Sequence, residues 1–204
     1  MYLLDEDANY FNEYYGEGIF VAIQKPTKRI LKIKTDGNLE DSFGNDAKRL
    51  RPKGNFYLSL PHVVFRITYA KHKESGRIIY APESLAVAFA TSLTPKDVYV
   101  PPLFNVDETL GVCIPLRGKF RSPSELCDYC IANFWKTEFN DGMCNAYEYS
   151  YADKDNSVLA NYARWQKKTK ENPNWIPTAR SMEYYGSYKD FCEETRLPEV
   201  LDRD

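Results

Sequence analysis

Runs of β-forming residues follow one another closely in the first half of this chain. The clearest is residues 63–69, where β-branched and aromatic residues, which favour a pleated strand, fill most positions. Short turn-forming segments separate the runs, at 25–28 and 73–76, and short turns join antiparallel strands. The sequence therefore predicts an antiparallel meander built largely from residues 18–80. Its expected strands are 18–24, 29–34, 55–60, 63–71 and 76–80.

A helix is predicted for residues 123–139. Ser122 is a possible N-cap, Pro123 suits the first helical position and Glu125 lies in the first turn. Apolar residues then recur at helical spacing, which indicates one buried face. These residues are Leu126, Cys130, Ile131, Phe134 and Trp135. Further helices are expected at 45–50, 155–170 and 188–195 and a short extended segment at 147–151, which together give an α+β fold.

Composition and charge argue against several classes of protein. The formal net charge is −2 and basic runs are confined to residues 48–51 and 167–170, which argues against nucleic acid as the main partner. Apolar runs are too short to span a membrane. Residues 1–7 are acidic where a signal peptide is basic, and the five cysteines should stay reduced without export. We expect a cytoplasmic protein with one domain over residues 1–204. Its core would be about 18–140 and a helical C-terminal extension about 145–204.

A possible thiol site follows residues 98–102, an extended segment that ends in two prolines. Asn105 stands eight residues before Cys113, with an acidic, turn-prone loop between them. The thiolate is the most nucleophilic common side chain, and an amide NH2 can stabilise an oxyanion. The pair is therefore a candidate for nucleophilic catalysis. Asp107 and Glu108 are possible supporting carboxylates that could help to deprotonate an attacking amine.

Plainer interpretations of the same residues stay open. Cysteine is among the most buried residue types, so Cys113 could be a small apolar core residue. Asn105 could be a turn residue that hydrogen-bonds its own backbone. Two neighbouring acidic residues in a loop are often simply solvated.

The segment around Asn105 and Cys113 resembles the active-site segment of ubiquitin-conjugating enzymes. Their motif reads His-Pro-Asn-Val, a short loop, Gly, a spacer and Ile-Cys-Leu, with the same Asn-to-Cys spacing. A closer resemblance is to a bacterial branch of that superfamily, the B protein of the PRTRC system, where Pro-Pro-Phe-Phe-Asn-Val leads through a loop to Val-Cys. An aromatic cluster in its following helix is similar to residues 134–139, and the likeness covers about residues 56–140.

The chain also departs from these patterns. Leu103 and Phe104 replace the His-Pro of the eukaryotic motif. Gly111 lies two residues before the cysteine rather than three, and Pro115 follows where the bacterial pattern has a nearby glycine.

The resemblance implies a ubiquitin-conjugating-enzyme-like fold, with the β-meander followed by an active-site loop and packing helices. It also favours a strand for residues 82–91, whose pattern alone fits a helix or a buried strand. Cys113 would take a ubiquitin-like modifier from an adenylating activating enzyme and pass it from a thioester to an amine. Asn105 would stabilise the oxyanion or order the loop. No cofactor or metal would be needed, and a JAB-type metallopeptidase is a further expected partner.

Other functions are open on the sequence alone. The chain could be a catalytically silent member of the same fold that binds a ubiquitin-like protein or scaffolds a complex. It could also be a structural or assembly protein of a mobile element, with a surface drawn from its 16 tyrosines as the interface. A cysteine-protease arrangement would need His62 or His72 as a base for Cys113.

A zinc site is a further possibility at Cys127 and Cys130, which have CxxC spacing. It would need Cys144 and a distant histidine to complete the ligand set. Because this pair falls within the predicted helix, packing in the core is the simpler interpretation.

Overall fold

The computed structural model of this chain describes residues 17–34, 53–74, 77–107, 109–140 and 157–193. The strands are β1 (Glu17–Gln24), β2 (Thr27–Lys34), β3 (Gly54–Leu60), β4 (His62–Glu74), β5 (Arg77–Ala90), β6 (Asp97–Val100), β7 (Phe139–Asn140) and β8 (Glu183–Ser187). The helices are α1 (Pro123–Lys136), α3 (Tyr162–Glu171), α4 (Tyr188–Glu193) and the 3-10 helix η3 (Ala179–Ser181).

The strands form a five-stranded sheet and a three-stranded sheet in a curled, mainly antiparallel arrangement. The first has the order β1-β4-β5-β6-β8 and the second the order β3-β2-β7. All neighbours pair antiparallel except β2 and β7, which are parallel. The α+β class and the antiparallel sheet predicted from the sequence are confirmed.

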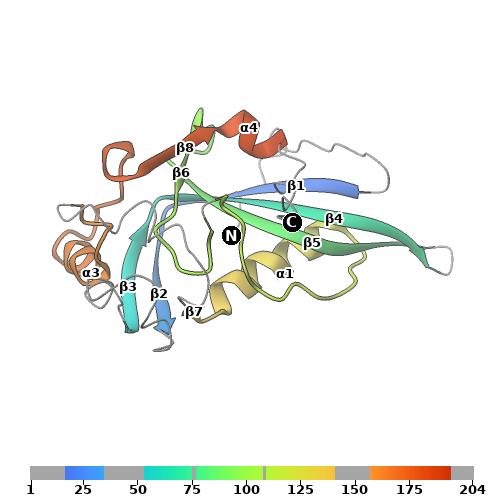
Figure 1. Cartoon of the computed structure of the whole chain (residues 1–204), viewed down its shortest axis with the longest axis horizontal. Helices are drawn as coiled ribbons and strands as arrows, with labels where there is room; N and C mark the ends of the chain where they lie inside the picture. Colours follow the sequence, from blue (N-terminus) through green and yellow to red (C-terminus); the bar gives the residue numbers. More distant parts are fainter. Residues whose placement is uncertain (1–16, 35–52, 75–76, 108, 141–156, 194–204) are drawn as a thin grey trace, which may run out of the picture.

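Two prolines divide the long strands of this arrangement. β1 pairs with β4, and β2 pairs with β3. The register of the first pair continues into the second, so Pro26 lies opposite Pro61 at the break. Neither proline has an N–H to donate, so the ladder is interrupted and the ribbon bends there. Figure 1 shows β2 and β3 turning away from the line of β1 and β4. The prediction of a hairpin turn at residues 25–28 is wrong, because β1 and β2 follow one another along the same ribbon instead of pairing.

Helix α1 lies inside the curve of the sheet (Figure 1). The Ser122 side chain accepts a hydrogen bond from the Glu125 N–H at 3.2 Å, which confirms the predicted start. The helix ends at Lys136 instead of about residue 139. Phe134 and Phe65 of β4 make an edge-to-face contact with ring centroids 5.6 Å apart. The buried face of the helix consists of Leu126, Cys127, Cys130, Ile131 and Phe134.

Strand β5 contains a bulge in its pairing with β4. The strand runs through most of residues 82–91, where the resemblance favoured a strand over a helix. Thr68 pairs with Ser84, whereas the next residue of β4, Tyr69, pairs with Pro82. Glu83 is therefore the extra residue of the bulge. A bulge bends its strand and redirects a side chain out of the regular alternation.

Helix α3 covers the outer edge of β3. The Gln166 side-chain oxygen accepts from the Tyr57 N–H at 2.7 Å, and the Thr169 hydroxyl oxygen accepts from the Ser59 N–H at 3.0 Å. The Trp165 indole N–H donates to the Ser59 carbonyl at 2.9 Å. These side chains bond to backbone groups that another strand could otherwise pair with.

The C-terminal part differs in detail from the prediction. The helix expected at 155–170 begins only after Asn161, whose side chain caps it. The helix expected at 188–195 is confirmed as α4 within the described residues. β8 was not predicted, so this part of the chain supplies a strand of the larger sheet as well as helices. The predictions for 45–50 and 147–151 lie outside the described residues.

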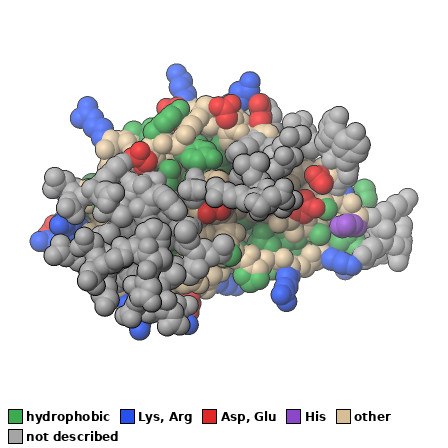
Figure 2. All heavy atoms as spheres, in the orientation of Figure 1, with side chains coloured by type: hydrophobic (Ala, Val, Ile, Leu, Met, Phe, Trp, Pro, Cys, Tyr) green, Lys and Arg blue, Asp and Glu red, His purple; other side chains and the backbone are tan. Residues whose placement is uncertain are grey.

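The described surface carries charges of both signs. Figure 2 shows Lys and Arg side chains interspersed with Asp and Glu side chains over the described part of one face. Within the described segments, no helix is both long enough and apolar enough to cross a membrane.

Candidate functional site

The loop that carries the candidate thiol is attached to β5 at two places. At the first, the backbone of residues 110–112 makes hydrogen bonds of 2.8 and 2.9 Å with β5. At the second, Tyr80 and Phe120 exchange two backbone hydrogen bonds of 2.8 Å. Cys113 comes directly after the first attachment. Cys113 is therefore the first residue of a loop segment whose two ends are both hydrogen-bonded to β5.

Cys113 is exposed, whereas the other three described cysteines, Cys127, Cys130 and Cys192, are buried. The Cys113 backbone N–H donates to the Asn105 carbonyl at 3.0 Å. Burial raises the pKa of the Cys130 thiol to about 12 and raises the pKa values of Cys127 and Cys192 as well. Cys113 is thus the accessible thiol of the described residues, and the interpretation of it as a core residue does not hold.

Asn105 joins the loop to the segment that follows α1. It is 6% exposed and has a φ of 70°, in the left-handed region that asparagine tolerates better than most residues. Its Nδ2 donates to the Glu138 carbonyl at 3.1 Å, and its Oδ1 accepts from the Asn140 N–H at 3.0 Å. Of the two roles expected for Asn105, these hydrogen bonds correspond to ordering of the loop.

Asp107 builds the turn between Asn105 and Cys113. Its Oδ1 accepts from the Thr109 N–H at 2.8 Å, the Thr109 hydroxyl at 2.7 Å and the Gly111 N–H at 2.8 Å. A Cβ on Gly111 would lie 2.7 Å from the Asp107 Oδ2, so a larger residue there would displace the carboxylate that forms the turn. Glu108, the other candidate carboxylate, lies outside the described residues.

A hollow of about 280 Å³ lies beside Cys113. Two carboxylates, Glu83 and Asp107, and the aliphatic residues Leu85, Ile114 and Leu116 are among its lining residues. Partial burial raises the pKa of Glu83, the negative charge of Glu17 raises it further, and His72 partly opposes both effects. Glu83 was not a sequence candidate. The one local signal was Pro82, because proline within a strand is confined to edges, strand starts and bulges.

His62 and His72 were the candidate bases for Cys113 in a cysteine-protease arrangement. Neither His62 nor His72 is among the residues that line the hollow. His62 opens β4 and pairs with Ala90, and burial, with a smaller effect of Lys25, lowers its pKa. The described residues do not assemble the histidine and cysteine of a protease-like pair at this hollow.

The CxxC cysteines are core residues of α1 in this structure. Cys127 and Cys130 are both buried, with burial the main cause of their raised pKa values. Within the described ranges no group of three or more His, Cys, Asp or Glu residues could hold a metal ion, and Cys144 lies outside those ranges.

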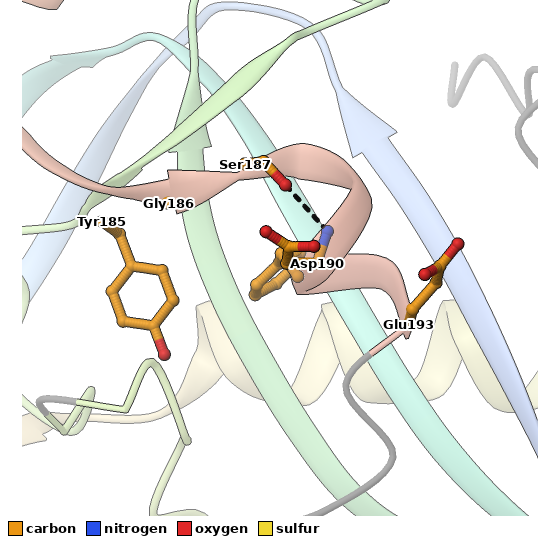
Figure 3. A pocket seen from close by; sticks show the side chains of 6 residues that line it. Tyr185, Gly186, Ser187, Asp190 and Glu193 are labelled. Atoms are coloured by element: carbon orange, nitrogen blue, oxygen red, sulfur yellow. Dashed lines mark hydrogen bonds between the residues drawn. The ribbon is translucent and has the colours of Figure 1, made fainter.

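A second hollow, of about 540 Å³, lies at β8 and α4 (Figure 3). Tyr185, Asp190 and Glu193 contribute its polar side chains together with Ser187. The Ser187 Oγ accepts from the Asp190 N–H at 3.0 Å, as the dashed line in Figure 3 shows. That hydroxyl therefore caps the short helix. The hollow beside Cys113 is the stronger candidate site because it contains an exposed thiol.

Comparison with protein-family models, with curated proteins and with solved structures gave no match to this chain.

Proposed function

We propose that this protein carries a ubiquitin-like modifier as a thioester on Cys113 and transfers it to an amine. The observation that carries the proposal is the exposure of Cys113 on a loop whose backbone is tied to β5 and to Asn105. A carrier thiol must be reached first by a large activated donor and then by an acceptor. It therefore needs an open position on a firm support, because a fixed geometry lowers the entropy cost of each attack.

The proposed chemistry has two steps. The Cys113 thiolate attacks the thioester held by an adenylating activating enzyme, and the modifier moves to Cys113 as that enzyme's thiol leaves. An amine then attacks the new thioester to form an amide, and Cys113 is released. The energy is stored in the thioester, so neither step needs a cofactor on this chain. The partners are the modifier, the activating enzyme and a JAB-type metallopeptidase that reverses the modification, all in the cytoplasm.

The architecture supports a ubiquitin-conjugating-enzyme-like fold for this proposal. The curled antiparallel sheet, the loop with Asn105 and Cys113, and α1 follow one another in the order that the resemblance implies. Asp107 and Gly111 form a compact turn, so the loop is ordered despite its departures from the family motifs.

A catalytically silent binding protein of the same fold is the second candidate. The observation that favours it is the engagement of both ends of the Asn105 amide by the backbone of Glu138 and Asn140. An amide used in this way supports the loop whether or not the thiol reacts. Such a protein would bind the modifier without forming a covalent bond.

The two candidates differ in one measurable product. Tagged protein isolated from its own cells under acidic, non-reducing conditions should contain an adduct on Cys113 that a thiol reductant removes. Cys113→Ala should abolish the adduct, and Cys113→Lys should trap it as an amide that resists reduction.

A matched control moves the thiol instead of removing it. Ser124 is exposed at the start of α1, so Cys113→Ala combined with Ser124→Cys offers an accessible thiol outside the hollow. This double variant should form no adduct. A wild-type protein that retains the modifier but never carries it covalently would establish the silent binding protein instead.

A further inference from the structure

We propose that Glu83 accepts the proton of the amine that attacks the Cys113 thioester, and that it makes this site selective for a cationic amine such as a lysine side chain. The inference depends on the thioester chemistry proposed above. It assigns the role of proton acceptor to a residue of β5, outside the motif around Cys113.

The position of Glu83 follows from the bulge in β5. Ser84 and Pro82 pair with consecutive residues of β4, which leaves Glu83 as the additional residue between them. Pro82 cannot donate a backbone hydrogen bond, so an irregular pairing costs little at this point. The bulge takes Glu83 out of regular alternation, and its side chain lines the hollow that also contains Cys113.

Among the described residues that line the hollow, the other carboxylate is Asp107, and it already has a structural role. The Oδ1 of Asp107 accepts three hydrogen bonds from Thr109 and Gly111, which form the turn before Cys113. Proton transfer to Asp107 would weaken those bonds. Glu83 is exposed on a strand, so it can gain and lose a proton without disturbing the loop.

The charges around Glu83 suit a proton acceptor. Glu17 of β1 and Asp107 of the loop are acidic, and the effect of His72 of β4 on the Glu83 pKa opposes that of Glu17. Two carboxylates facing one hollow attract an ammonium group. The raised Glu83 pKa also brings this carboxylate closer to neutral pH, where a general base is most effective.

One proton of the bound ammonium moves to the Glu83 carboxylate, and the freed lone pair of nitrogen forms a bond to the thioester carbonyl carbon. The C–S bond breaks and its electron pair stays on the Cys113 sulfur, which takes the proton from Glu83. Nitrogen releases its second proton to solvent, which leaves an amide and a free thiol.

The test uses the purified full chain and a chemically made thioester, so it needs no activating enzyme. A short peptide ending in Gly-Gly, supplied as its mercaptoethanesulfonate thioester, is exchanged onto Cys113 and the excess is removed. Discharge is then followed by intact mass with lysine or with hydroxylamine as the acceptor. Hydroxylamine is largely neutral at neutral pH, so it does not need a base to free its lone pair.

Glu83→Gln should slow discharge to lysine by about 10²-fold, the usual contribution of a general base. Discharge to hydroxylamine and loading of Cys113 should stay at the wild-type rate. The lysine rate of the wild type should rise with pH through the Glu83 titration, whereas the variant should lack that step. Glu83→Asp should restore part of the lysine rate. Glu171→Gln, at an exposed glutamate on α3, is the matched control and should behave as the wild type.

The outcomes separate this inference from the proposed function. A Glu83→Gln protein that discharges to lysine at the wild-type rate, or that loses lysine and hydroxylamine discharge equally, overturns the role of Glu83 and leaves the thioester carrier intact. A wild-type thioester that reacts with lysine no faster than the free peptide thioester overturns the proposed transfer itself. Thermal melting of each variant verifies that the fold is retained.

Discussion

Replacement of Asn105 by alanine tests whether this residue holds the loop together. The change removes the hydrogen bonds to Glu138 and Asn140 and places an alanine at a φ of 70°. Each hydrogen bond contributes about 1 kcal/mol, and more where a buried partner is left unsatisfied. A left-handed backbone costs alanine about 1–2 kcal/mol. Asn105→Ala should therefore lower the free energy of unfolding by about 3–4 kcal/mol.

Asn105→Gly separates the two causes. Glycine loses the same hydrogen bonds but adopts the positive φ without strain, although it adds about 0.5–1 kcal/mol of flexibility to the unfolded chain. It should lower the free energy of unfolding by about 2–3 kcal/mol, less than alanine does.

Urea unfolding followed by the fluorescence of the three tryptophans measures both changes. With a denaturant slope of about 2 kcal/mol per molar, Asn105→Ala should shift the midpoint by about 1.5–2 M. A shift that corresponds to less than about 0.5 kcal/mol, the range of ordinary surface substitutions, would refute the structural role of Asn105. Its amide would then be available mainly for chemistry at Cys113.

Three further outcomes are expected. Thr169→Val removes the buried hydroxyl at the edge of β3 and should lower the free energy of unfolding by about 1–3 kcal/mol in urea titration; an unchanged midpoint would mean that the edge does not need it. Gly18→Ala would bring a Cβ to 2.4 Å from the Tyr69 ring, whereas Gly186→Ala meets no atom within 4 Å. Overpacking of about 1–3 kcal/mol should lower the melting temperature of the first variant by about 3–10 °C, and equal melting of the two would contradict the close contact. Limiting iodoacetamide followed by peptide mass spectrometry should label Cys113 before the buried cysteines, because alkylation needs an accessible thiolate; earlier labelling of a cysteine in α1 would show that the loop does not expose the thiol.

The sequence predicted those elements whose signals are local. The strand around residues 63–69 follows from its own β-branched and aromatic residues, and the start of α1 follows from Ser122 and Pro123. The exposed position of Cys113 agrees with the turn-prone residues before it. Each of these features is specified within a few neighbouring residues, so pattern and propensity are sufficient to find it.

Features that depend on distant partners were not accessible in this way. Asn105 forms hydrogen bonds with Glu138 and Asn140, which lie 33 and 35 positions further along the chain. A local sequence pattern does not indicate such partners. The bend at Pro26 depends on a second proline that the strand register brings opposite to it. Glu83 reaches the hollow through a shift in register between β4 and β5. Register is set by the packing of the whole sheet.

The cover that α3 provides for β3 has a consequence for the newly synthesised chain. The three hydrogen bonds that close this edge join residues 106, 109 and 110 positions apart. A ribosome adds about 5–20 residues per second, so the finished β2–β3 pair waits roughly 5 to 20 seconds for its covering helix. Throughout that interval the nascent protein presents an unsatisfied strand edge to every neighbouring polypeptide. The order of synthesis, more than the contacts of the completed molecule, therefore determines when this protein is most open to misassembly.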